Sequence, residues 1–173
     1  MKEEIIPNVW KIGSRWSQEG KKERSIINLF LDAGIVFFGD NQKGTTNYIE
    51  LYKDKIQEGD YFLIADGLKI YAVAKVIKEK DTTNVGKYIQ FFNEKIIEKL
   101  STSSEKIFDY NYETGWNNAF GWKVNIYSID SLDLSQRSIK VSRKRIYKMK
   151  KYKEDVIYLY NQLHQSKNNN PNG

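Results

Sequence analysis

The stretch Gly59–Asp81, GDYFLIADGLKIYAVAKVIKEKD, decides the fold. Its two runs of β-branched and aromatic residues, 61–65 and 69–78, flank Asp66-Gly67, a dipeptide typical of tight hairpin turns. We therefore predict an antiparallel hairpin and assign Asp66 wholly to the turn, with no part in a binding site. The whole chain of 173 residues is long enough for one domain with its own hydrophobic core.

Upstream of the hairpin, the pattern predicts a strand, a helix and a second strand. Alternation over 9–16 predicts a strand with Trp10, Ile12, Ser14 and Trp16 on one face. The next helix lies between two capping residues, Ser25 and Gly34, and the apolar run 35–39 is typical of a short buried strand.

Downstream, we expect a helix over 86–100, strands over 106–112 and 122–130, and a final helix over 142–164 capped by Ser142. The last prediction rests on one apolar stripe at spacings of three and four, formed by Ile146, Met149, Tyr152, Val156, Leu159 and Leu163. The elements together predict an α+β fold, a small curved β-barrel flanked by helices. We expect a single domain over residues 1–165 and a disordered polar tail over 166–173.

The composition argues against most enzyme classes. The chain has no Cys and a single His, His164, so thiolate metal sites, Cys nucleophiles and His-centred triads are not expected. It has no phosphate-binding glycine loop and no clustered carboxylates of the kind a metal nuclease needs. We therefore predict a non-enzymatic protein without metal or cofactor. The absence of a signal peptide and of a long apolar run predicts a cytoplasmic protein with no membrane partner.

The positive charge is concentrated in one place. The net charge is +6, and residues 143–153, RKRIYKMKKYK, contain seven cations and no acid, so the rest of the chain is close to neutral. We call residues 143–153 the basic segment. On the predicted helix, its first-turn cations would oppose the helix dipole at about 0.3–1 kcal/mol each. A solvated helix face is the alternative, but an acidic partner explains that cost, and nucleic acid is the first choice.

The residues that we predict to contact phosphate come from the basic segment and from the polar stretch after Trp16. They are Arg15, Lys21, Lys22, Arg143, Lys144, Arg145, Lys148 and Lys151. Two of the four Trp residues also fit a ligand better than a core. Trp16 borders that polar stretch, and Trp116 lies between Gly115 and Asn117, so each indole could stack on a flat base.

The order of these motifs resembles the PUA-like superfamily, especially its YTH and EVE branches. The resemblance is carried by Ile12-Gly13-Ser14 in the first strand, Phe37-Phe38-Gly39, Gly59-Asp60 before the hairpin, the strand Trp122–Asp130 and the final helix Ile146–Leu163. It covers about residues 8–164, with Gly13 in place of a Lys and Phe38 in place of a Trp.

The resemblance implies a nucleic-acid reader that flips a modified, methylated base into an aromatic cage. It suggests Phe38, Trp116 and Trp16 as the cage walls, and Ser14, Asp40 and Asn117 as readers of the base edge. DNA is favoured over RNA, and a restriction or defence system would supply an effector partner such as a nuclease or an NTPase. Three alternatives stay open: an RNA-binding module, a module for protein or small ligands, and an RNA-processing enzyme on a PUA-like fold.

Overall fold

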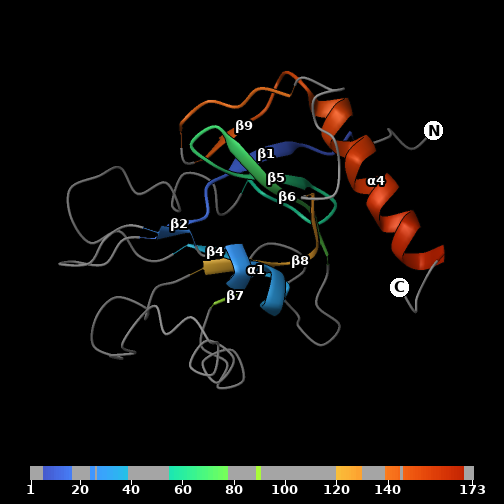
Figure 1. The fold of residues 1–173 in the computed structure, drawn as a ribbon, viewed down its shortest axis with the longest axis horizontal. Helices are drawn as coiled ribbons and strands as arrows, with labels where there is room; N and C mark the ends of the chain where they lie inside the picture. The colour runs from blue at the N-terminus through green and yellow to red at the C-terminus, as the bar shows by residue number, and fades with distance from the viewer. Residues whose placement is uncertain are drawn as a thin grey trace.

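A curled sheet is the centre of the computed structural model, which describes residues 6–16, 24–25, 27–38, 55–77, 89–90, 120–129, 139–144 and 146–169 (Figure 1). Its strand order is β4–β8–β6–β5–β1–β9, with β7 also paired to β8. The strands are β1 (Val9–Ile12), β4 (Ile35–Phe38), β5 (Tyr61–Asp66), β6 (Lys69–Val76), β7 (Ile89–Gln90), β8 (Phe120–Ser128) and β9 (Ile146–Lys148). Two short strands, β2 (Arg15–Trp16) and β3 (Arg24–Ser25), pair separately.

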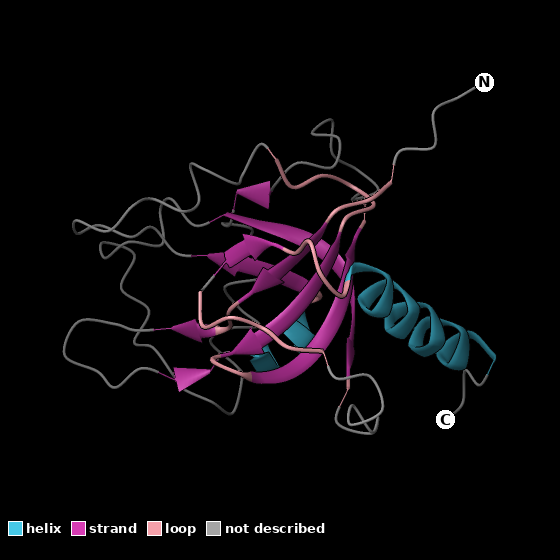
Figure 2. Cartoon of the chain, turned by 90° about the horizontal axis from the view of Figure 1, so that it is seen from above, coloured by secondary structure: helices cyan, strands magenta, loops and turns pink. Residues whose placement is uncertain are grey.

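Two helices of the described residues flank the sheet. The short helix α1 (Ile27–Ala33) packs on β4 and β8. Helix α4 (Lys153–Asn169) contacts β5, β6, β1 and β8, and Figure 2 shows it on the outside of the sheet. The predicted fold class is therefore confirmed in its coarse form: a curled, half-barrel sheet of α+β type.

The hairpin is present, but its turn is shifted by one residue. Asp66 pairs with Lys69 as the last position of β5, so the two-residue loop is Gly67–Leu68. Gly67 takes a left-handed φ of 57°, which a residue without a Cβ adopts without strain. The interpretation of Asp66 as a turn residue is wrong, because its side chain is buried within the domain.

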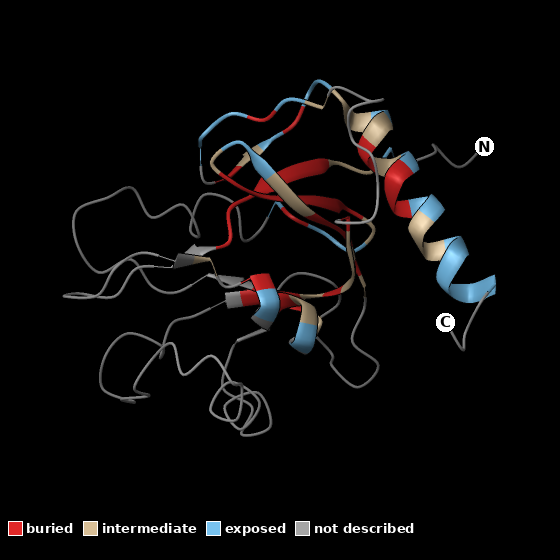
Figure 3. Cartoon of the chain, in the orientation of Figure 1, coloured by how far each residue is buried: buried red, intermediate tan, exposed pale blue. Residues whose placement is uncertain are grey.

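The first strand lies between a distant central strand and a strand from near the end of the chain. β1 runs parallel to β5 and antiparallel to β9, so Ile12 lies opposite both Ile64 and Ile146. The predicted strand over 9–16 is accordingly two strands, interrupted at Gly13–Ser14. The parallel pair explains the uniform burial of β1, since it is covered on both faces (Figure 3).

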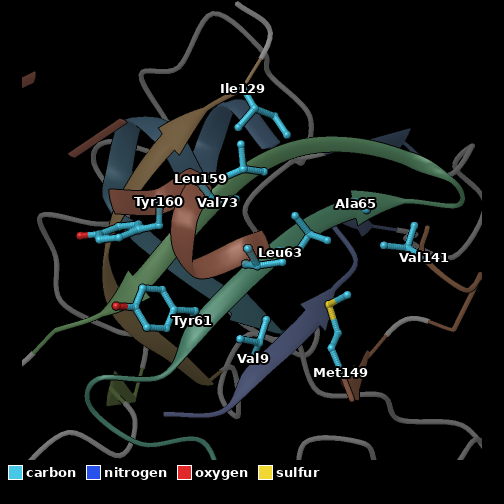
Figure 4. Packing of buried hydrophobic residues seen from close by; sticks show 11 residues of the cluster. Val9, Tyr61, Leu63, Ala65, Val73, Ile129, Val141, Met149, Leu159 and Tyr160 are labelled. Atoms are coloured by element: carbon cyan, nitrogen blue, oxygen red, sulfur yellow. The ribbon is translucent and has the colours of Figure 1, made fainter. Parts of the chain in front are cut away.

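The core under α4 is built from alternate residues of the central strands. Val9, Tyr61, Leu63, Ala65 and Val73 face Val156, Leu159 and Tyr160 of the helix (Figure 4). The intervening residues of β1 and β5, such as Trp10 and Phe62, are equally buried and do not belong to that cluster. Phe62 instead contacts Trp122 edge-on, with ring centroids 5.9 Å apart. The sheet thus buries both faces.

The upstream helix and strand are confirmed. Helix α1 follows Ser25, whose Oγ accepts a hydrogen bond from the Ile27 amide at 3.4 Å. It ends at Gly34, which has a φ of 63° and donates its amide to the Phe30 carbonyl at 2.9 Å. The run 35–39 corresponds to β4.

The final helix begins about ten residues later than predicted. Residues 142–152 contain β9 and extended or bent segments, and α4 starts at Lys153 with Glu154 and Asp155 in its first turn. Those acids suit the positive end of a helix, whereas Arg143, Lys144 and Arg145 would oppose it. Ile146 therefore pairs with β1, an arrangement that its apolar spacing alone does not distinguish from a helix.

Two further predictions differ from the structure in part. Helix α4 continues to Asn169, so the expected disordered tail is helical over 166–169. Within the expected helix 86–100, residues 89–90 are strand β7; the rest of that range and the expected strand 106–112 lie outside the described residues. The strand expected over 122–130 is confirmed as β8, which begins two residues earlier, at Phe120.

Candidate functional site

One end of the sheet gathers polar and basic groups from three distant parts of the sequence. Since Ile12 is level with Ile64 and Ile146, the residues after β1, those at the end of β5 and those before β9 lie together. These are Ser14, Asp66 and Lys144.

Ser14 and Asp66 form a buried polar pair. Ser14 is 1% exposed and Asp66 is 6% exposed. Asp66 Oδ1 accepts hydrogen bonds from the Ser14 amide at 2.7 Å and from its hydroxyl at 2.8 Å. Ser14 Oγ also lies 3.0 Å from Ser25 Oγ, which connects the pair to the start of α1. The pair fixes the point where β1 ends and β2 begins.

A second buried carboxylate, Asp60, belongs to the scaffold. Its Oδ2 accepts hydrogen bonds from Trp10 Nε1 and from the Gln57 amide, both at 3.0 Å, and its Oδ1 accepts one from the Asn8 amide at 3.1 Å. The Gly59-Asp60 motif therefore joins the start of β1 to the start of β5. Each Asp60 oxygen has at least one donor, so both are engaged in holding these two strand starts together.

The basic segment presents its charge to solvent at the edge of the sheet. Arg143, Lys144, Lys148, Lys150 and Lys151 are all exposed, and β9 ends the strand order. The basic segment is strand and bend here, not the predicted helix, so these cations do not share one helical face. They extend instead along the edge formed by β9, from Arg143 and Lys144 at the Ser14 end to Lys148, which is level with Trp10, and beyond it.

The start of the basic segment is held by internal contacts. Lys11, only 1% exposed, donates from Nζ to the Lys144 carbonyl at 2.6 Å. The Lys144 amide donates to Ser142 Oγ at 3.1 Å, and the Ser142 amide donates to the Tyr147 hydroxyl at 2.9 Å. The backbone at Arg143 and Lys144 is thus fixed while their side chains point to solvent.

The remaining predicted site residues are described in part or not at all. The backbone of Arg15 and Trp16 forms β2 directly after Ser14. Phe38 is the last residue of β4, which lies at the opposite end of the strand order from β9. Their side chains lie outside the described part. So do six whole residues of the prediction, Lys21, Lys22, Asp40, Trp116, Asn117 and Arg145. The aromatic cage thus stays a prediction.

Sequence reasoning missed a polar cluster under α4. The Tyr127 hydroxyl lies 2.6 Å from His164 Nδ1, and the His164 ring stacks on Tyr160 with centroids 5.5 Å apart. Burial raises the pKa of Tyr127, and burial raises that of Tyr160 to about 12 against a hydrogen bond from Asn125. A tyrosine that acts as a nucleophile or general base needs a lowered pKa, so the raised values do not point to that role, and the contacts of both rings with His164 indicate packing. In the sequence, the one sign of this cluster is that His164 lies near the apolar stripe of the final helix.

Comparison of this chain with known proteins found no match among family models, curated proteins or solved structures. Among the described residues, no group of three or more His, Cys, Asp or Glu side chains is placed to hold a metal ion. Neither described helix has the length and apolar character needed to cross a bilayer.

Proposed function

We propose that this chain binds nucleic acid at the end of the sheet where Ser14, Asp66 and the basic segment meet. The observation that carries the proposal is the combination, at one end of the sheet, of two exposed cations, Arg143 and Lys144, a backbone fixed by Lys11, and a buried polar pair, with three more exposed cations further along the same edge. Phosphates favour such an acid-free row of cations, and the fixed backbone lowers the entropy lost on binding.

In the finer form of the proposal, the protein reads a modified base, with DNA favoured over RNA. The resemblance to PUA-like readers of the YTH and EVE type supports this form. So does the position of Trp16, two residues after Ser14 in the chain. A flipped base would stack on aromatic side chains, with Trp16, Phe38 and Trp116 as the candidates, while the basic segment holds the backbone.

The basic segment has a second explanation that involves no ligand. β9 is an edge strand, and lysines on exposed edges prevent pairing with other chains. This explanation accounts for Lys148, which lies within the strand. It does not account for Arg143 and Lys144, which precede β9 beside the buried polar pair.

The salt dependence of binding tests the proposal. The variant Arg143→Gln/Lys144→Gln removes two charges and leaves every backbone contact of Lys144 in place. For duplex DNA, the slope of log K against log salt should fall by about 0.9 for each phosphate that the protein no longer neutralises, and by about 1.8 in all. The matched control is Lys55→Gln/Lys167→Gln, two exposed lysines away from this end of the sheet, which should keep the wild-type slope.

Three outcomes would each refute one part of the proposal. An unchanged affinity and slope in the Arg143→Gln/Lys144→Gln variant would refute the proposed interface. The finer form is tested by comparing methylated and unmodified oligonucleotides at one salt concentration. Equal affinity for both would remove the modified-base claim, and discrimination that survives both Trp16→Ala and Trp116→Ala would remove the cage.

A further inference from the structure

The buried pair of Ser14 and Asp66 has an oxygen with no donor. Asp66 Oδ1 receives two hydrogen bonds from Ser14, but Oδ2 is buried without a hydrogen-bond partner among the described residues. The nearest cation along the ladder does not supply one, since Lys69, which pairs with Asp66 in the register, directs its Nζ over the Tyr71 ring at 5.0 Å. Asp60, by contrast, has a donor for each oxygen.

The hydrogen-bond directions around Asp66 are fixed by its acceptor character. A carboxylate only accepts, so the Ser14 hydroxyl donates to Oδ1 at 2.8 Å and must accept from Ser25 Oγ at 3.0 Å. Ser25 Oγ in turn accepts from the Ile27 amide. The hydroxyl hydrogens of Ser14 and Ser25 are therefore both used, and Asp66 Oδ2 is the acceptor that receives no hydrogen bond.

A buried acceptor of this kind is costly unless it is satisfied. Leaving a buried polar group without its hydrogen bond costs a few kcal/mol, and more for a charged group. An unsatisfied buried group of this kind calls for an explanation, and a bound ligand that donates a hydrogen bond is one. Oδ2 lies at the end of the sheet that carries Arg143 and Lys144, so an anionic ligand held there would bring its own donors close to it.

We propose that Asp66 Oδ2 accepts a hydrogen bond from the exocyclic amine of an adenine or cytosine base. This inference rests on the proposed function. Guanine would present N1–H and N2–H side by side and so needs both carboxylate oxygens, but Oδ1 is already occupied by Ser14. The N3–H of thymine lies between two carbonyl oxygens, which would face the carboxylate. A projecting amine needs only one oxygen.

Base analogues that lack the amine test this directly. We would measure the affinity for oligonucleotides in which one adenine is replaced by purine, or one cytosine by 2-pyrimidinone. Loss of a hydrogen bond to a charged acceptor should weaken binding about 10- to 100-fold. The variant Asp66→Asn keeps an oxygen for Ser14 and places an NH2 group at the Oδ2 position, so it should abolish or reverse this preference. Arg143→Gln/Lys144→Gln is the control: it should bind more weakly and keep the preference.

The outcomes separate this inference from the proposed function. If the wild-type protein binds no nucleic acid, both are wrong. If it binds, but binds amine-bearing and amine-lacking probes equally, the proposed function stands and the role of Asp66 is refuted. The same refutation follows if Asp66→Asn discriminates as well as the wild type. Should Asp66→Asn fail to fold, the analogue comparison on the wild-type protein still decides.

Discussion

The same substitution should destabilise the protein much more at one buried aspartate, Asp60, than at the other, Asp66. In Asp60→Asn, the amide oxygen can take the place of Oδ2, which has two partners, but the NH2 group then faces the Asn8 amide, itself a donor. One hydrogen bond to a charged acceptor is removed, worth about 1.5–3 kcal/mol, and two are weakened, so we expect a loss of about 3 kcal/mol.

Asp66→Asn should cost far less. The amide oxygen can keep both Ser14 contacts, and the substitution removes a buried charge that has an unsatisfied oxygen. Weaker bonds to Ser14 and a buried NH2 group offset that gain, so we expect a change within about 1 kcal/mol.

Urea denaturation at pH 7, followed by tryptophan fluorescence, measures both variants against the wild type. The comparison uses two residues of the same type and similar burial, 5% and 6% exposed, so size and desolvation largely cancel. An equal loss in both variants, or a loss below about 1 kcal/mol in Asp60→Asn, would refute the assignment of Asp60 to the scaffold and of Asp66 to a ligand.

Two further predictions concern stability. Because the pKa of Tyr160 is raised to about 12 in the folded protein, its contribution is complete below pH 10 and is lost as the pH rises from 10 to 12. Between pH 9 and 11.5 the free energy of unfolding should therefore fall by roughly 2 kcal/mol less in Tyr160→Phe than in the wild type. Urea titrations at the two pH values measure this difference, and an equal fall in both proteins would contradict the prediction. Gly67 has a left-handed φ, so Gly67→Val should destabilise by about 1–2 kcal/mol and Gly67→Asn by clearly less in thermal unfolding; equal losses would show that strain is not the cause.

The elements that could be predicted from the sequence are those with local signals. The hairpin 61–76 follows from alternation and a turn dipeptide, and α1 from its capping residues. Apolar spacing alone does not locate the start of α4. Ile146 and Met149 would be buried in a helix stripe, and they are also buried in the observed structure, in and just after β9. The charge pattern held the missing information: cations disfavour a helix start at 143, and Glu154 with Asp155 favours one at 153.

The candidate site was predicted less well, since its geometry depends on long-range pairing. The role of Ser14 as a reader of the base edge stays a prediction; the structure shows Ser14 hydrogen-bonded to Asp66, which was assigned to a turn. A shift of one residue in the loop separates the two interpretations, and only the pairing of Asp66 with Lys69 resolves them. The hydrogen bond from Lys11 to Lys144 spans 133 residues and leaves no local pattern.

The position of β1 between β5 and β9 has a consequence for synthesis of the protein. A strand from the first dozen residues needs a partner from residues 146–148, and the face that includes Val9 and Tyr61 is covered by α4. While β9 and α4 are still inside the ribosome, the domain is therefore incomplete, with the outer edge of β1 unpaired and apolar side chains uncovered. We expect folding to be completed only after α4 has left the ribosome, so truncation within α4 should produce aggregation rather than a smaller folded domain.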